Sequence, residues 1–191
     1  MYPGKRAAQH PDRLAVGMAG SGETLTYGEL EARSNRLAHL LRARGFGRLD
    51  HYSIYMENHV RYVECCAAGE RAGHYYTCVN SFLTVEELAY ILNNSQSKVL
   101  ITSQAKREVA LAALALCPKV ELCLIADGEG SGPQIVNLDA AAAAFPATPV
   151  ADEALGTAML YSSGTTGRPR ESYGHCRTSR PPGSFRSSTS C

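Results

Sequence analysis

The sequence predicts an α/β fold in which a parallel sheet lies between layers of helices. Short apolar segments rich in Val, Ile, Leu and Tyr alternate along the 191 residues with longer segments of helical spacing. Two helices are expected to begin at Thr-x-x-Glu capping boxes, Thr26–Glu29 and Thr84–Glu87. Strands that alternate with helices are joined by crossover connections, and these produce a parallel sheet.

The first half of the chain is predicted to hold a hairpin and then strands separated by helices. Leu30, Leu37 and Leu41 fall on one face of the first long helix, which indicates burial of that face. Gly45 and Gly73 follow two of the helices and are expected to end them. The elements are strands 14–18 and 23–25, helix 26–44, strand 52–56, helix 60–71 and strand 75–79.

The second half continues the alternation with shorter elements. Asn93 and Asn94 are expected to stop the helix that begins at the second capping box. Residues 127–133 are rich in Gly and indicate a loop, and prolines at 146 and 149 separate a short helix from the last strand. The elements are helix 84–92, strand 98–102, helix 106–116, strand 120–125, helix 138–144 and strand 157–161.

The composition excludes several classes of protein. Hydrophobic residues make up 45% and charged residues 19% of the chain, which is typical of a globular protein. A net charge of +1 argues against a nucleic-acid-binding surface. The longest apolar run, residues 109–117, is about half of a membrane span, and no apolar signal-peptide stretch follows Met1. The sequence predicts a cytoplasmic protein with no transmembrane segment and no nucleic-acid partner.

Seven cysteines raise the question of a metal site or of disulfides. No C-x-x-C pair occurs, Cys65 and Cys66 are adjacent, and the six histidines are scattered without an H-E-x-x-H pattern. An odd number of cysteines without a secretory signal is typical of reduced, buried thiols. The sequence therefore predicts no metal ligands.

The most informative segment is Tyr-Ser-Ser-Gly-Thr-Thr-Gly-Arg-Pro-Arg at residues 161–170, at the end of an apolar strand. Its glycines let backbone N–H groups approach anionic oxygens, and its hydroxyls add donors. The spacing fits neither the G-x-x-x-x-G-K-[ST] loop of ATPases nor the G-x-G-x-x-G dinucleotide fingerprint. The segment predicts polyphosphate binding, and a Gly/Ser/Thr surface linker is the alternative.

This segment resembles the phosphate-loop signature of the adenylate-forming superfamily, which includes acyl-CoA synthetases, luciferases and the adenylation domains of peptide synthetases. Nine of its ten positions match, and the departure is Arg170, where the family has Lys. Softer similarities at residues 25–30 and 79–92 extend the resemblance over about residues 13–170. The order of the signature favours the fatty-acid–CoA ligase branch.

The resemblance implies that the chain forms part of the layered α/β N-terminal domain of these enzymes. It implies that ATP activates a carboxylic acid, in this branch a fatty acid, to acyl-AMP, and that coenzyme A then takes the acyl group, with Mg²⁺ offsetting phosphate charge. It assigns no catalytic residue and no metal ligand here. Arg170 keeps the charge of the family lysine but is a wider, planar group. The implied nucleotide contacts are Ser162, Ser163, Gly164, Thr165, Thr166 and Gly167.

Residues 172–191 differ from the rest of the chain. They contain no Ala, Val, Ile, Leu or Met and no acidic residue, so they cannot bury enough apolar surface to offset the entropy of ordering. The sequence predicts a partial family domain at residues 1–171 and a disordered tail at residues 172–191. A shifted reading frame after about Arg170 would explain this tail, and a genuine basic tail is the alternative.

No tail residue matches the motifs that the family carries after the phosphate loop. The expectation is therefore a truncated acid–CoA ligase that is inactive alone and self-associates through faces that would pack on the missing half. A non-catalytic remnant that binds a nucleotide or a protein partner is the alternative.

Overall fold

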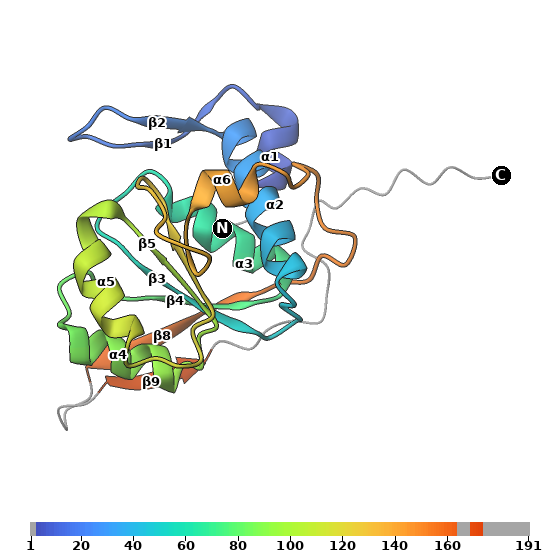
Figure 1. Ribbon diagram of the computed structural model, residues 1–191. Coiled ribbons are helices and arrows are strands. Elements are labelled where there is room, and N and C mark those ends of the chain that lie inside the picture. The colour runs from blue at the N-terminus through green and yellow to red at the C-terminus, as the bar shows by residue number, and fades with distance from the viewer. Residues whose placement is uncertain (1–2, 164–168, 174–191) are drawn as a thin grey trace.

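A seven-stranded sheet forms the centre of the computed structural model, which describes residues 3–163 and 169–173 (Figure 1). The strand order is β7-β6-β5-β3-β4-β8-β9, and every neighbouring pair is parallel except β8 and β9. A separate antiparallel pair joins β1 (Leu14–Gly17) and β2 (Thr24–Thr26). The strands of the main sheet are β3 (His51–Tyr55), β4 (Tyr75–Cys78), β5 (Val99–Thr102), β6 (Leu122–Ile125), β7 (Ile135–Asn137), β8 (Thr157–Ser163) and β9 (Pro169–Tyr173).

Helices cover both faces of this sheet. Three of them, α2, α3 and α6, pack on one face, and α4 and α5 pack on the other (Figure 1). The layered α/β fold that the sequence predicts is confirmed. The helices are α1 (Gly4–Gln9), α2 (Tyr27–Ala43), α3 (Tyr62–Ala72), α4 (Val85–Asn94), the 3₁₀ turn η1 (Gln104–Lys106), α5 (Arg107–Leu114) and α6 (Leu138–Ala142).

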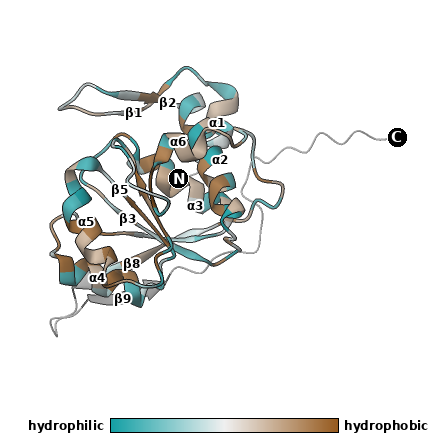
Figure 2. Cartoon of the chain, viewed as in Figure 1, coloured by the Kyte–Doolittle hydropathy of each residue, from teal (hydrophilic) through white to brown (hydrophobic). Residues whose placement is uncertain are grey.

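The buried strands supply side chains to two cores. In β5, Val99 and Ile101 belong to the core under α2 and α3, whereas Leu100 belongs to the core under α4 and α5. The four residues of β6 divide in the same way. Successive side chains of a strand point to opposite faces, so a parallel strand covered on both faces is apolar throughout. Figure 2 shows hydrophobic residues in the central strands and in the helices beside them.

The capping boxes and the helix-ending glycine that the sequence predicts are present in the structure. Thr26 Oγ1 accepts a hydrogen bond from the Glu29 backbone N–H at 3.2 Å, and Glu29 Oε2 accepts one from the Thr26 N–H at 2.8 Å. The bond from the Thr26 N–H, together with one that the Thr26 hydroxyl donates to Glu29 Oε2 at 3.0 Å, lowers the pKa of Glu29. The same reciprocal arrangement between Thr84 and Glu87 begins α4. Gly73 follows α3 with a φ of 72°, the left-handed conformation that ends a helix.

Four elements were not predicted from the sequence: α1, the 3₁₀ turn η1, β7 and β9. The helix α1 buries only Ala7, so it has no apolar period to detect. The strands β7 and β9 are each defined by pairing with one neighbour, β6 and β8 respectively. The last two residues of β9 belong to the segment that we assigned to the tail. The helix α4 also continues through Asn94, because Ser95 rather than Asn93 is its C-cap.

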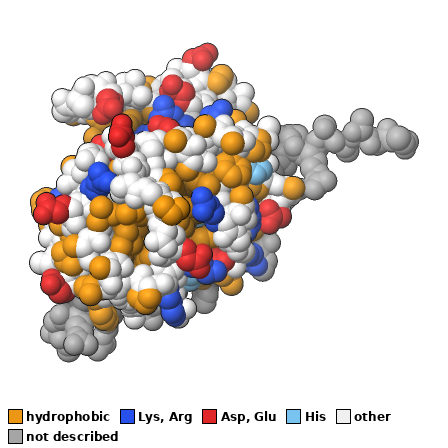
Figure 3. All heavy atoms as spheres, viewed as in Figure 1, with side chains coloured by type: hydrophobic (Ala, Val, Ile, Leu, Met, Phe, Trp, Pro, Cys, Tyr) orange, Lys and Arg blue, Asp and Glu red, His pale blue; other side chains and the backbone are white. Residues whose placement is uncertain are grey.

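The surface retains large apolar side chains. Phe82 is 89% exposed and Leu160 is 58% exposed. Figure 3 shows hydrophobic side chains on the face that carries α5, where Leu111, Val120 and Ile135 line a groove of about 310 Å³. Such a surface is compatible with self-association, which stays a prediction. Within residues 3–163 and 169–173, no helix combines the length and the hydropathy needed to cross a bilayer.

Candidate functional site

The predicted phosphate-binding segment begins inside β8. This strand is two residues longer than the sequence predicts, and Ser162 and Ser163 are its last residues. The antiparallel strand β9 returns beside it, with Pro169 opposite Ser163. The other four predicted contacts, Gly164, Thr165, Thr166 and Gly167, lie outside the described residues.

The direction of β8 decides where this segment leaves the sheet. Ala158 lies opposite Tyr76 in a parallel pairing, so β8 runs in the same direction as β4 and the other parallel strands. Ser162 and Ser163 therefore lie toward the carboxyl edge of the sheet, the edge at which open α/β sheets bind ligands. The nucleotide contacts themselves stay a prediction.

Polar side chains from other strand ends pair at the same edge. Ser103 Oγ, after β5, donates to Glu57 Oε2, after β3, at 2.6 Å. His59 Nδ1 accepts from the Arg61 backbone N–H at 3.1 Å, so the ring proton lies on Nε2, which is 3.5 Å from Asp127 Oδ2. The sequence did not indicate these pairs, because their members follow different strands. No cluster of three or more His, Cys, Asp or Glu side chains that could hold a metal ion occurs in the described part of the chain.

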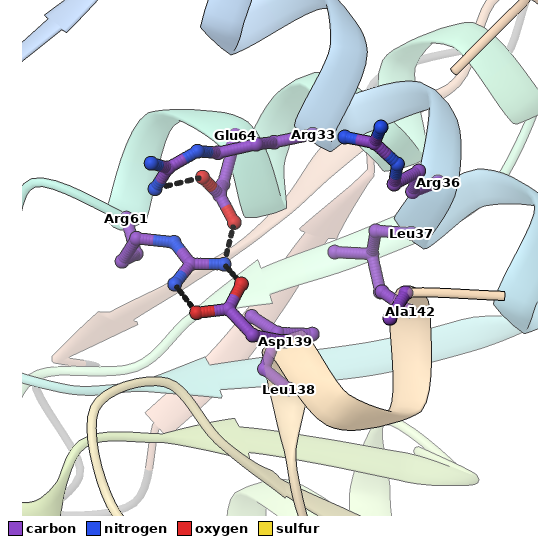
Figure 4. Close-up of a pocket in the computed structure, with 9 residues that line it drawn as sticks. Arg33, Arg36, Leu37, Arg61, Glu64, Leu138, Asp139 and Ala142 are labelled. Atoms are coloured by element: carbon purple, nitrogen blue, oxygen red, sulfur yellow. Dashed lines mark hydrogen bonds and ion pairs between the residues drawn. The ribbon is translucent and has the colours of Figure 1, made fainter. Parts of the chain in front are cut away.

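A cavity of about 380 Å³ lies among α2, α3 and α6 (Figure 4). Arg61, immediately before α3, is buried and lines this cavity. Its Nη1 and Nη2 donate to Asp139 Oδ2 and Oδ1 at 2.8 and 2.7 Å, and Nη2 lies 2.7 Å from Glu64 Oε1. Arg33 of α2 approaches Glu64 Oε2 from the other side at 3.8 Å.

Burial and ion pairing oppose each other in this cluster of Arg61, Glu64 and Asp139. Burial raises the pKa of Glu64, and the hydrogen bond from Arg61 offsets this only in part. Burial also raises the pKa of Asp139, but there the Arg61 contacts prevail and the net shift is downward. For Arg61, the two carboxylates outweigh burial and raise the pKa, so the guanidinium stays charged. The Arg61 guanidinium pairs with both carboxylates. The cluster therefore links the start of α3 to α6, and we call it the clamp.

Asp139→Asn is expected to lower the melting temperature by about 2–4 °C near neutral pH. The effect is small because Asp139 is 66% exposed. Its pKa is lowered in the folded chain, so its stabilising contribution is present above the unfolded value of about 3.9 and is lost as the pH falls through the lower folded value. Melting curves of both proteins from neutral to strongly acidic pH would check this. A difference in melting temperature that becomes larger as the pH falls would contradict this prediction.

The prediction that the cysteines are buried thiols is only partly right. Cys65, Cys117 and Cys123 are buried, whereas Cys66 is half-buried and Cys78 is exposed. All five are free thiols. Cys78 is the last residue of β4 and lies at the carboxyl edge of the sheet, where its side chain is exposed.

Comparison with known proteins decides the family. The AMP-binding enzyme family matches residues 4–170. The chain belongs to this family. It is 32% identical over 176 residues to "Long-chain fatty acid transport protein 1" of Mus musculus and 36% identical over 169 residues to "Feruloyl-CoA synthase" of an Amycolatopsis species. The predicted relationship to acyl-CoA synthetases is confirmed.

The chain corresponds to only a part of its relatives. The two alignments cover 86% and 88% of this chain but 27% and 31% of the relatives. A solved structure of a Mycobacterium tuberculosis fatty acyl CoA synthetase shares the fold, with a TM-score of 0.71 at 24% identity, over 87% of this chain and 32% of that one. The family match ends at residue 170, and the proposed domain boundary at 171 stays a prediction.

Proposed function

We propose that this chain supplies the phosphate-binding part of an ATP-dependent acid–CoA ligase. The observation that carries the proposal is the position of the signature. Ser162 and Ser163 end β8 at the carboxyl edge of the sheet, and the family match includes the whole segment 161–170. In the proposed reaction, a carboxylate attacks the α-phosphate of ATP to give acyl-AMP and pyrophosphate, and coenzyme A then accepts the acyl group.

The six signature residues from Ser162 to Gly167 would hold the β- and γ-phosphates. Backbone N–H groups and hydroxyls suit phosphate oxygens, and their role is positioning and electrostatic stabilisation rather than covalent chemistry. Mg²⁺, when bound, would offset the phosphate charge. The signature itself offers mainly donors, which fit the phosphates, so the ion would be held chiefly through phosphate oxygens. Arg170 would add a positive charge beside them.

We propose a fatty acid as the substrate because the order of the signature favours that branch. The names of the two relatives refer to a long-chain fatty acid and to a feruloyl group, so both aliphatic and aromatic acids belong in a substrate panel. A cytoplasmic location is also part of the proposal.

The chain is expected to bind ATP with a dissociation constant of about 1 mM or weaker. A few phosphate hydrogen bonds, each worth ~0.5–1.5 kcal/mol net, must offset an association cost of roughly 4–15 kcal/mol. Equilibrium dialysis with labelled ATP and Mg²⁺ measures this binding. Replacing both Gly164 and Gly167 by Val is expected to abolish it, since side chains there would block the approach of the backbone to phosphate.

Gly20→Ala is the matched control, because an added methyl group there meets no atom within 4 Å. This variant should bind ATP as the wild type does. Equal retention of ATP by the wild type and the Gly164/Gly167 double variant would contradict the phosphate site.

No pyrophosphate release is expected from the 191-residue chain with ATP, Mg²⁺ and either class of acid. The motifs that the family carries after the phosphate loop have no counterpart in residues 171–191. A coupled pyrophosphate assay over the acid panel tests this. Acid-dependent release that disappears in the Gly164/Gly167 double variant would show that the chain is a working enzyme.

A further inference from the structure

Two thiols from different elements meet at the carboxyl edge of the sheet. Cys66 lies in the first half of α3, and Cys78 is the last residue of β4. Their Sγ atoms are 3.9 Å apart, and both thiols are free. A disulfide has an S–S length of about 2.05 Å, so the sulfurs must approach by roughly 1.9 Å, which is within the reach of side-chain rotation.

The two thiols differ in acidity and in access. The hydrogen bond from the Cys66 thiol, with a second from the nearby Tyr62 hydroxyl, lowers the pKa of Cys78 to about 7. The same bond and burial raise the pKa of Cys66. Cys78 is exposed. The pair therefore combines an accessible thiolate with an adjacent protonated thiol, the arrangement in which one cysteine is oxidised and the other resolves it.

The other described cysteines lack these properties. Burial raises the pKa of Cys65, of Cys117, and of Cys123, the last to about 12. All three side chains are buried. A thiol that is both buried and protonated reacts slowly with oxidants and alkylating agents. Reactivity should therefore be concentrated at Cys78.

We propose that Cys66 and Cys78 are a modification site at which hydrogen peroxide oxidises the two thiols to an intrachain disulfide. The Cys78 thiolate attacks one peroxide oxygen, the O–O bond breaks, and the products are a sulfenic acid and, after protonation, water. The Cys66 sulfur then attacks the Cys78 sulfur and releases the second oxygen as water. Two thiols lose two electrons and two protons, and hydrogen peroxide is reduced to two molecules of water.

The bond would link α3 to β4 beside the strand that carries the signature. The strand β8 is the direct neighbour of β4, and Cys78 stands two residues beyond Tyr76, which pairs with Ala158. The disulfide would thus fix two elements at the edge where Ser162 and Ser163 leave the sheet.

The test uses the full chain with Cys176 and Cys191 replaced by Ser, so that only the five described thiols remain. Treatment with hydrogen peroxide near neutral pH should reduce the intact mass by about 2 Da. Non-reduced tryptic digestion should then yield residues 62–71 linked to residues 72–98, a product that disappears on reduction. Before oxidation, iodoacetamide should label Cys78 at least about tenfold faster than Cys123.

Single variants identify the partners and their order of reaction. Cys78→Ala should form no linked peptide. Cys66→Ala should also form none, but should accumulate a sulfenic acid at Cys78 that dimedone traps. Cys123→Ala, which removes a buried thiol outside the pair, should still form the linked peptide. Circular dichroism confirms that each variant is folded. The linked peptide in Cys66→Ala, disulfides between chains as the main product, or thiols that all stay reduced would each overturn the proposal.

Discussion

Replacing Arg61 by Ala is expected to lower the free energy of unfolding by about 3–5 kcal/mol. Glu64 is only 1% exposed, and Arg61 is its closest charged partner at 2.7 Å. Arg33, at 3.8 Å and 37% exposed, cannot replace that contact. Without Arg61 the buried Glu64 carboxylate loses most of its compensation, and such a charge costs several kcal/mol.

The loss of stability in Arg61→Ala should be larger at high pH than at low pH. Burial already raises the pKa of Glu64, and removal of Arg61 takes away the largest opposing interaction. The folded Arg61→Ala chain would then bind a proton at Glu64 that the unfolded chain releases, so its stability falls as the pH rises above the unfolded value of about 4.3. Urea unfolding near pH 5 and pH 8 should show the larger deficit at pH 8.

Two further variants distinguish the effect of losing the ion pair from the effect of losing side-chain volume. Arg36→Ala changes another arginine of the same cavity and should cost no more than about 0.5 kcal/mol. Arg61→Met combined with Glu64→Leu removes both charges and should recover much of the stability lost in Arg61→Ala. A single Arg61→Ala variant within about 1 kcal/mol of the wild type would refute the clamp.

The elements that the sequence predicts correctly depend on local chemistry. The capping box of Thr26 and Glu29 acts over three residues, and Gly73 acts through its own backbone conformation. Strands such as β5, which is apolar from Val99 to Ile101, are typical of a sheet that is covered on both faces. These signals suffice for the layered α/β fold, because each is independent of where distant segments pack.

The features that the sequence does not predict depend on contacts between distant residues. Arg61 and Asp139 are 78 positions apart, and no periodicity relates them. Cys66 and Cys78 are separated by a helix end and a strand, so spacing rules for disulfides or metals miss the pair. The three-residue strand β7 follows a Gly-rich segment and is defined by its pairing with β6. Each of these contacts is set by how the elements are arranged around the sheet, which local sequence patterns do not encode.

Gly156→Ala is expected to destabilise the chain by about 3 kcal/mol or more, toward the upper limit for overpacking. Gly156 is buried directly before β8, and its N–H donates to the Glu70 carbonyl at 2.8 Å. A methyl group at this position would overlap the carbonyl oxygens of Gly69 and His74. Both obstacles are backbone atoms of α3 and of the turn into β4, so no side-chain rotation can relieve the overlap.

The same substitution should disturb the candidate site. The Thr157 N–H donates to the His74 carbonyl at 3.1 Å, and this contact begins the pairing of β8 with β4. If the methyl group displaces residue 156, the start of β8 moves with it, and Ser162 and Ser163 are carried on that strand. Urea unfolding and ATP dialysis on Gly156→Ala should therefore show losses together, whereas Gly20→Ala should match the wild type in both. A Gly156→Ala chain as stable as the wild type would mean that the close approach of this segment to α3 is not required for the fold.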